Sequence, residues 1–556
     1  MNIKTDHIVG DESNIACDIL VERDVDVPMR DGLRLKADVF RPVVEGTYPV
    51  ILCMGVYHKD MDFTLGPNAT PSQYPNFEAL TPEDYVPHGY VLVRIDTRGS
   101  GRSPGFLKVF DSVEESKDYY DAIEWAASQP WSTGAIGLSG TSYLGMNQWA
   151  AAGMQPPHLK CIVPHEALTD MYRHSTYPGG IYREAFQSWY MDRMSDHLLR
   201  HEARDGDANQ NVGAENTTFL FMQHRLDGPF WKGRGSDAYM NKINVPMLTI
   251  SAWPNWGAVG HLRGSTEGFK EAASKHKRLV IHDQQFIDGS ISIYGKLDTE
   301  EHLRWYDRHL KGVENEVDDM PPVKLAIRNS TQAGDYVWRE ENEWPLARTR
   351  YTPYYLNAVD GGTLDLIPPS AAAEAEYLSG PLNAITQVKP QEAMAAFMGK
   401  GIDTTGVTFT TAPFTQDTEV TGELALYIKA ASSLKDMDVH ASVSIIQPDG
   451  REELVTRGWL KASHRKLDEK RSTLSMPYHT HDQEQYLAPG EPVDLAIDIW
   501  PTSMVYRTGS RLRLRIAPTS SGFYGYTRAA SRGHNTIFTG GDNPAHLLLP
   551  IIPPNC

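Results

Sequence analysis

The sequence predicts an α/β domain with a mostly parallel sheet, a helical insertion within it, and a separate all-β domain after it. Three observations lead to this organisation. Strand-like and helix-like segments alternate over residues 1–165 and 244–320, a pattern typical of a parallel sheet covered by helices on both faces. Residues 166–243 lose that rhythm and have helical spacing, which predicts a cap over the site. From residue 321 to 556, short alternating strands predict a β-sandwich of jelly-roll type.

The first domain contains apolar runs that fit strands buried on both faces of a sheet. Residues 49–54 and 90–96 are the longest of these runs. The other predicted strands are 21–28, 33–40, 159–164, 246–250 and 278–281, and the predicted helices are 114–128 and 299–310. In the second domain the predicted strands are 323–327, 352–356, 423–430, 440–446, 493–499 and 511–516.

Ser142 stands at the most informative corner of the chain. A short apolar strand ends in Gly140-Thr141, and a helix is expected to begin near Tyr143. A serine at such a strand-to-helix turn is strained and exposed, small neighbours let the backbone pass, and the helix N-terminus directs N–H groups at developing negative charge. The pattern predicts a nucleophile elbow.

Composition and charge exclude several classes of function. The net charge of −18 argues against nucleic acid or an anionic membrane as the main partner, because binding phosphate needs a basic face. No apolar run approaches the roughly 20 residues of a membrane span. The four cysteines are widely spaced and form no CxxC pair, and no signal-peptide pattern is seen, so a cytoplasmic protein is expected.

The ordered motifs along nearly the whole chain resemble the cocaine esterase / X-prolyl dipeptidyl peptidase (CocE/NonD) family of α/β-hydrolases. The segments that carry the resemblance are 27–33, 37–42, 96–101, 129–145, 419–423, 448–451, 500–503, 509–514 and 546–550. The resemblance implies an α/β-hydrolase domain and Ser142 as the nucleophile. It also implies an oxyanion hole made by the backbone N–H of Tyr143 and the hydroxyl of Tyr57, since a phenol can direct a strong donor at a tetrahedral intermediate.

Two support positions depart from the family pattern. The acid normally stands in a Gly-Trp-x-Asp segment, and here Ala252-Trp253-Pro254-Asn255 has an amide at that position. The histidine normally closes a Gly-Pro-Trp-x-His segment, and here the aligned residue is Phe286. A serine hydroxyl without a base is a poor nucleophile, so another residue must supply the base if Ser142 is active.

The sequence leaves three alternatives for the missing groups. In the preferred alternative His282 is the base that moves the proton, with Asn255 orienting its ring as an amide does in Cys-His-Asn sites. His261 could instead reach the site. Asp283 or Asp288 could replace the lost acid. A structural role for His282 is an equal alternative.

Several residues of the cap are candidates for lining an acyl pocket, although packing is the default interpretation for each. These are Glu166, Asp170, Tyr172, Tyr177 and Gly179-Gly180, with the aromatic residues Trp189, Tyr190, Trp231 and Trp256 as possible walls or core.

The leading functional hypothesis is a serine hydrolase or acyltransferase that acts on an ester or amide of a small organic acid through an acyl-Ser142 intermediate. The first alternative is a repurposed enzyme, such as a lyase, cyclase or isomerase of a secondary metabolite, because the expected acid and base are Asn255 and Phe286. The second is a non-catalytic binding protein. No metal or organic cofactor is implied. The expected partner is a small-molecule substrate, and a homodimer is left open.

Overall fold

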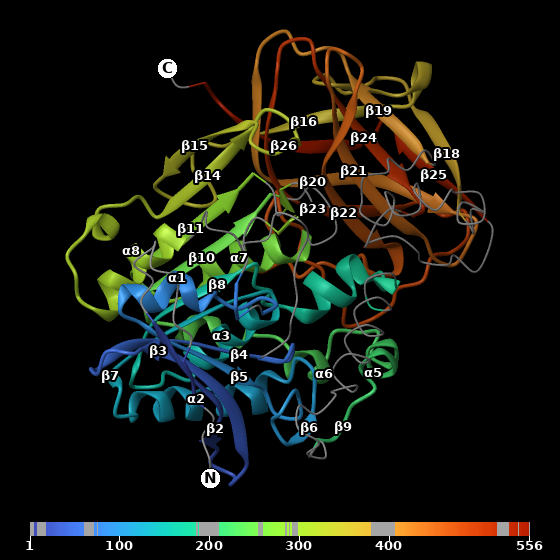
Figure 1. Ribbon diagram of the computed structural model, residues 1–556. Helices are drawn as coiled ribbons and strands as arrows, with labels where there is room; N and C mark the ends of the chain where they lie inside the picture. Colours follow the sequence, from blue (N-terminus) through green and yellow to red (C-terminus); the bar gives the residue numbers. More distant parts are fainter. Residues whose placement is uncertain are drawn as a thin grey trace.

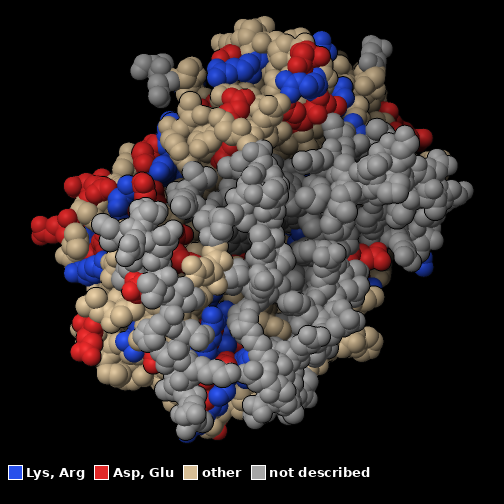
Figure 2. All heavy atoms as spheres, viewed as in Figure 1, with Lys and Arg blue, Asp and Glu red and all other residues tan. Residues whose placement is uncertain are grey.

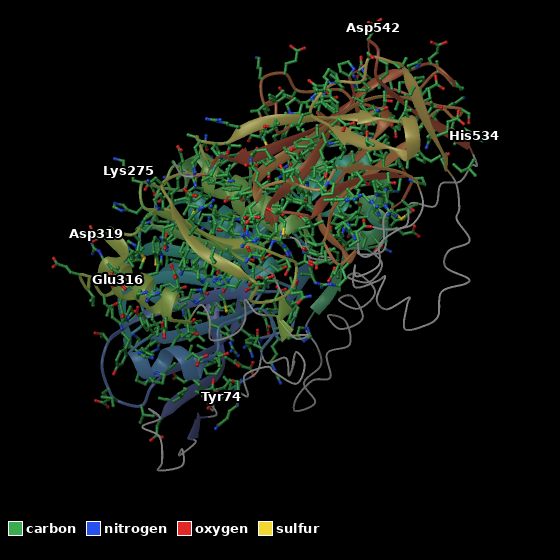
Figure 3. The ribbon with its side chains drawn as sticks, turned by 90° about the horizontal axis from the view of Figure 1, so that it is seen from above. Tyr74, Lys275, Glu316, Asp319, His534 and Asp542 are labelled. Atoms are coloured by element: carbon green, nitrogen blue, oxygen red, sulfur yellow. The ribbon has the colours of Figure 1, made fainter. Side chains whose placement is uncertain are left out.

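The computed structural model describes most of the chain and contains two domains in contact (Figure 1). The described residues are 5–7, 18–59, 72–74, 76–184, 187, 211–253, 259–283, 286–287, 290–291, 299–379, 406–519, 533–542 and 544–554. Seen from above, Tyr74 lies on the first domain, and His534 and Asp542 lie at the far side of the second (Figure 3).

Eleven strands of the described residues form the sheet of the first domain. Their order is β1-β2-β3-β5-β4-β7-β8-β10-β11-β14-β15. The central pairs from β5 to β14 are parallel, and the pairs at both edges are antiparallel. The bounds are β1 (Thr5–His7), β2 (Ile19–Pro28), β3 (Arg34–Pro42), β4 (Tyr48–Gly55), β5 (Val91–Asp96), β7 (Ser132–Thr141), β8 (Leu159–His165), β10 (Met247–Ala252), β11 (Lys277–His282), β14 (Val323–Arg328) and β15 (Tyr336–Glu341).

Helices cover both faces of this sheet, as the continuous apolar strands require. One core cluster packs α2 (Ser112–Ala127), α3 (Tyr143–Gly153) and α7 (Val259–Glu271) on one face. A second cluster packs α1 (Pro82–Tyr85) and α8 (Thr299–Leu310) on the other. The α/β-hydrolase architecture predicted for this domain is confirmed.

The described part of the insertion is made of short elements packed around aromatic side chains. Tyr172, Tyr177, Phe221 and Trp231 form a buried cluster that also contains Tyr57 and Tyr143 of the first domain. The elements are a π-helical turn η2 (Tyr172–Thr176), η3 (Pro178–Gly180), α5 (Thr217–Gln223), α6 (Pro229–Lys232), η4 (Met240–Lys242) and β9 (Asn211–Ala214), which pairs with β6 (Gly105–Leu107). Trp189, Tyr190 and Trp256 lie outside the described residues.

The second domain is a β structure with its own core. Its described strands follow the order β18-β25-β20-β23-β22-β21-β24-β19-β17-β16-β26, and β20 also pairs with β26, so the sheet closes on itself. The bounds are β16 (Arg350–Asn357), β17 (Thr363–Asp365), β18 (Ala373–Ser379), β19 (Val407–Thr411), β20 (Thr418–Ser432), β21 (Asp438–Ile446), β22 (Glu452–Lys461), β23 (Val493–Tyr506), β24 (Arg511–Ala517), β25 (Gly533–Thr539) and β26 (His546–Ile552). The all-β character is confirmed, and the jelly-roll type stays a prediction.

Residues 323–327, which the sequence analysis assigns to the second domain, belong to the first sheet. β14 pairs in parallel with β11, and β15 extends the sheet by one antiparallel strand. The first sheet therefore continues past residue 320. An apolar strand run is compatible with either sheet, so the sequence pattern did not distinguish them.

No helix among the described residues has both the length and the apolar character needed to cross a membrane. In the described part of the face seen in Figure 2, basic and acidic side chains are interspersed.

Candidate active site

Ser142 occupies the predicted elbow between β7 and α3. Its backbone is strained, with φ 53° and ψ −111°. The Ser142 N–H donates to the carbonyl of His165 at 3.0 Å, which ties the elbow to the end of β8. Close packing explains the glycines around it. A Cβ on Gly140 would lie 2.4 Å from the Cβ of Leu144, and one on Gly145 would lie 2.6 Å from the His165 carbonyl.

His261 is the histidine that meets Ser142. The Ser142 Oγ lies 3.2 Å from the His261 Nε2, within reach for transfer of the hydroxyl proton. His261 belongs to the first turn of α7, which follows β10 in the chain. Burial, together with the nearby Arg183 guanidinium, lowers the pKa of His261 to about 3, so the ring is neutral at neutral pH and can accept a proton.

Glu166 supplies a carboxyl group on the other side of the His261 ring. Its Oε2 lies 3.5 Å from the His261 Nδ1, and its Oε1 accepts a hydrogen bond from the Ser251 hydroxyl at 3.2 Å. The residue is 1% exposed. Burial raises the pKa of Glu166 to about 8, although hydrogen bonds from Ser251 and the Ala252 backbone favour the ionised form.

Strand register explains why Ser142 and Glu166 are neighbours. Thr141 of β7 pairs with His165 of β8, so the residues that follow these strand ends emerge side by side at the carboxyl edge of a parallel sheet. Glu166 has φ 45°, and its N–H donates to the Ile250 carbonyl at 2.8 Å, which turns the chain at this point. The sequence analysis treated Glu166 as a cap residue. Its place directly after an apolar strand was the signal for a site residue.

Tyr57 and Tyr143 lie together at the elbow. Tyr57 follows β4, the neighbour of β7 in the sheet, and its ring meets that of Tyr143 edge-on with centroids 6.1 Å apart. The Tyr143 hydroxyl points into the core and donates to the Glu115 carboxylate at 2.8 Å. Tyr143 is also the first residue of α3, where backbone N–H groups have no acceptor within the helix. Its side chain thus anchors the helix start while its backbone faces the elbow.

His282 does not meet Ser142 in the arrangement expected for a base. It ends β11, and β8 and β10 stand between β11 and β7. At about 4.8 Å per strand, its backbone is roughly 14 Å from the elbow strand. The His282 ring packs edge-on against Trp338 of β15, with centroids 5.1 Å apart. The preference for His282 over His261 is therefore corrected, because the Ser142 Oγ meets His261 and the His282 ring packs against Trp338.

The remaining candidates for support groups do not enter the described site. Asp283 accepts a hydrogen bond from the backbone N–H of Gly334 at 2.8 Å and so holds the turn between β14 and β15. Asn255 and Asp288 lie outside the described residues, as does the side chain of Phe286. No group of three or more His, Cys, Asp or Glu side chains within the described ranges could hold a metal ion.

The other cap candidates have packing roles. Asp170 pairs with Arg173 at 2.8 Å, and the Tyr172 and Tyr177 hydroxyls donate to the carbonyls of Arg225 and Phe221. A Cβ on Gly179 would lie 2.1 Å from the carbonyl of Trp459 in the second domain. The first three contacts lie within the cap, and Gly179 packs the cap against the second domain.

Comparison with known proteins supports the same fold. The family model described as X-Pro dipeptidyl-peptidase (S15 family) matches residues 31–287, and that of the X-Pro dipeptidyl-peptidase C-terminal non-catalytic domain matches residues 315–547. A cocaine esterase from Rhodococcus sp. (strain MB1 Bresler) is 28% identical over 96% of this chain and 98% of its own length. A putative serine esterase from Mycobacterium bovis is 24% identical over 88% of this chain and 89% of its own.

Solved structures of other proteins share the fold of this chain over both domains. The crystal structure of a CocE/NonD family hydrolase from Staphylococcus aureus is 30% identical, with a TM-score of 0.86 and coverage of 99% of this chain and 97% of that one. An α-amino acid ester hydrolase shares the fold with a TM-score of 0.72 at 18% identity, covering 98% of both chains.

Proposed function

Because this chain belongs to the CocE/NonD family of hydrolases, we propose that it is a serine hydrolase that cleaves an ester or amide of a small organic acid through an acyl-Ser142 intermediate. The observation that carries the proposal is the hydrogen-bonded pair of Ser142 and His261, with Glu166 behind the histidine. The order serine, acid, histidine along the chain is that of α/β-hydrolases. The acid here follows β8, the strand next to the nucleophile strand.

In the proposed reaction, His261 Nε2 takes the hydroxyl proton as Ser142 Oγ attacks the substrate carbonyl carbon. The carbonyl π electrons move to oxygen, and the backbone N–H of Tyr143 with the Tyr57 hydroxyl stabilises the oxyanion. When the tetrahedral intermediate collapses, His261 gives the proton to the departing alcohol or amine. Water, or another acceptor in acyl transfer, then attacks the acyl-serine with His261 again as base.

Glu166 has two roles in this scheme. It holds the Nδ1 side of the ring, so that Nε2 faces the serine, and its ionised form stabilises the imidazolium that forms in each step. The lyase, cyclase or isomerase alternative, and the non-catalytic one, were motivated by the apparent lack of an acid and a base. The Glu166 and His261 contacts remove that motive.

Labelling with an aryl fluorophosphonate, followed by intact mass, tests the assignment. We expect the wild-type protein to gain a single label rapidly, Ser142→Ala to gain none, and His261→Ala to react at least about 100-fold more slowly. His282→Ala is the matched control and should label at the wild-type rate. Loss of labelling in His282→Ala with normal labelling in His261→Ala would overturn the choice of base.

The names of the relatives define the first substrate panel. Cocaine esterase names an ester substrate and X-Pro dipeptidyl-peptidase names a peptide substrate. Short acyl p-nitrophenyl esters and Xaa-Pro p-nitroanilides should therefore be compared at equal concentration. Turnover of either class that disappears in Ser142→Ala supports the proposal. No turnover of either class, together with no labelling, would contradict it.

A further inference from the structure

Helix α7 carries His261 and also contacts the second domain. Arg263 is two residues after His261 and only 4% of its side chain is exposed. Its guanidinium donates to both carboxylate oxygens of Asp498 on β23, and it lies 3.4 Å from Glu423 Oε1 on β20. β20 and β23 are paired neighbours, so the two carboxylates come from one rigid part of the second domain.

Two turns further along, α7 makes a second contact with β20. Lys270 lies 3.0 Å from Glu423 Oε1 and 2.8 Å from Glu267 Oε1. Arg263, Glu267 and Lys270 follow the i, i+4, i+7 spacing of one helix face. His261 precedes Arg263 by about 200° of helical rotation, so it lies on the face turned away from the second domain.

The adjacent side of α7, which carries Gly260 and Gly264, has no space to adjust. A Cβ on Gly260 would lie 1.9 Å from the His174 carbonyl, and one on Gly264 would lie 2.4 Å from the Ala167 carbonyl. Both carbonyls belong to the segment that follows Glu166. The helix is therefore held between this backbone and the paired strands of the second domain, and its rotation fixes where the His261 ring lies.

Burial makes the Arg263 pair sensitive to geometry. A buried ion pair contributes little net stability compared with apolar packing, but the loss of one partner leaves a buried charge unpaired. The Arg263 Nη2 contacts both oxygens of Asp498 while its Nη1 faces Glu423, so the planar guanidinium spans two carboxylates in a fixed orientation that the single ammonium of a lysine cannot reproduce. The pair is thus better suited to fixing the position of α7 than to stabilising the protein.

We propose that Arg263 and Asp498 form an interdomain clamp that positions His261 against Ser142. This inference rests on the proposed function, because it takes His261 as the base. The second domain then contributes to catalysis without touching the reacting atoms, although its matching family model is described as non-catalytic. Arg263 and Asp498 are positioning residues in this scheme.

Arg263→Lys and Asp498→Asn test the clamp, with Arg339→Lys as matched control. Arg339 on β15 makes a bidentate pair with Glu419 on β20 at 2.7 Å, which also joins the two domains but is remote from α7. We expect Arg263→Lys and Asp498→Asn to lower kcat and the labelling rate by about 10- to 100-fold with KM changed little, since small displacements of a catalytic group have effects of this size. Arg339→Lys should leave kcat unchanged.

The pH dependence of labelling separates positioning from general destabilisation. A displaced His261 ring becomes more solvated, so its pKa rises toward the usual value, and labelling of Arg263→Lys falls further as the pH is lowered from 7 to 5, where the wild-type His261 stays neutral. Glu166 and Arg183 are the charged groups that act on this ring. Equal losses in Arg263→Lys and Arg339→Lys, or a kcat unchanged in both clamp variants, would overturn the inference. Normal labelling of His261→Ala would instead overturn the proposed function.

Discussion

Glu166 combines two opposing requirements at a single residue. Its carboxyl is buried behind the His261 ring, where the charged form is poorly solvated, and its pKa is raised to about 8. The same charge is what stabilises the imidazolium formed during catalysis. Because the folded-state pKa lies above the usual value of 4.5, the group holds its proton at neutral pH and releases it as the pH rises through about 8.

We therefore expect kcat/KM for an ester substrate to increase between pH 7 and pH 9. Glu166→Gln should lose this increase and be slower by about 100-fold or more at pH 9, since an amide cannot supply the charge. Asp283→Asn is the control, because Asp283 is the rival acid suggested by the sequence and binds the Gly334 turn instead. A pH profile that keeps its rise in Glu166→Gln and loses it in Asp283→Asn would show that Glu166 is not the acid.

Local sequence is enough to predict some site residues, whereas the positions of others depend on how distant strands are arranged in the sheet. The elbow at Ser142 is local, because its strand, glycines and helix are contiguous in the chain. The choice between His261 and His282 depends on sheet order, since three strand spacings separate β7 from β11. Glu166 depends on the register of β7 and β8. The family positions, now Asn255 and Phe286, follow β10 and β11 in the chain, whereas Glu166 follows β8.

At the scale of elements, the strands and helices of the first sheet were largely predictable from apolar periodicity. Predicted helix 299–310 coincides with α8, and predicted helix 114–128 overlaps α2 with small shifts at both ends. The sheet to which β14 belongs was not predictable, because its run has no feature specific to either domain. Within the insertion that the sequence predicts to be helical, residues 185–186 and 188–210 lie outside the described residues.

Helix α7 offers a test of how closely element packing controls the site. Gly260→Ala would force a Cβ against the His174 carbonyl, and backbone cannot yield as a side chain does, so the first turn must move with His261. We expect fluorophosphonate labelling to slow at least about 10-fold while the protein stays folded. Gly228→Ala, also at a helix start, is the control, since its nearest neighbour is 4.0 Å away. Equal labelling rates in both variants would mean that α7 tolerates the displacement.

At the scale of the whole molecule, two of the arginine contacts between the domains involve different elements of the first domain. Arg263 connects the second domain to the helix that carries His261. Arg328 connects it to the sheet itself: it is 1% exposed on β14, and it donates to the Ser503 carbonyl at 3.0 Å and the Thr502 hydroxyl at 2.7 Å on β23. Burial lowers the pKa of Arg328 to about 10, while the Asp283 carboxylate opposes that shift. The Arg263 contact therefore affects the active site, and the Arg328 contact affects how stably the two domains are held together.

Arg328→Met should therefore separate stability from activity. The substitution keeps the apolar bulk but leaves two buried acceptors without a donor, so we expect the free energy of unfolding to fall by about 3 kcal/mol. Urea denaturation followed by fluorescence measures this loss.

Below the transition, labelling at Ser142 should stay within about twofold of wild type, because effects at distant sites are independent. Arg451→Ala, at a solvent-exposed pair with Asp449, should leave the midpoint unchanged. A fall in the labelling rate of folded Arg328→Met comparable with that of Arg263→Lys would mean that the site depends on domain contact in general and not on the contact made by α7.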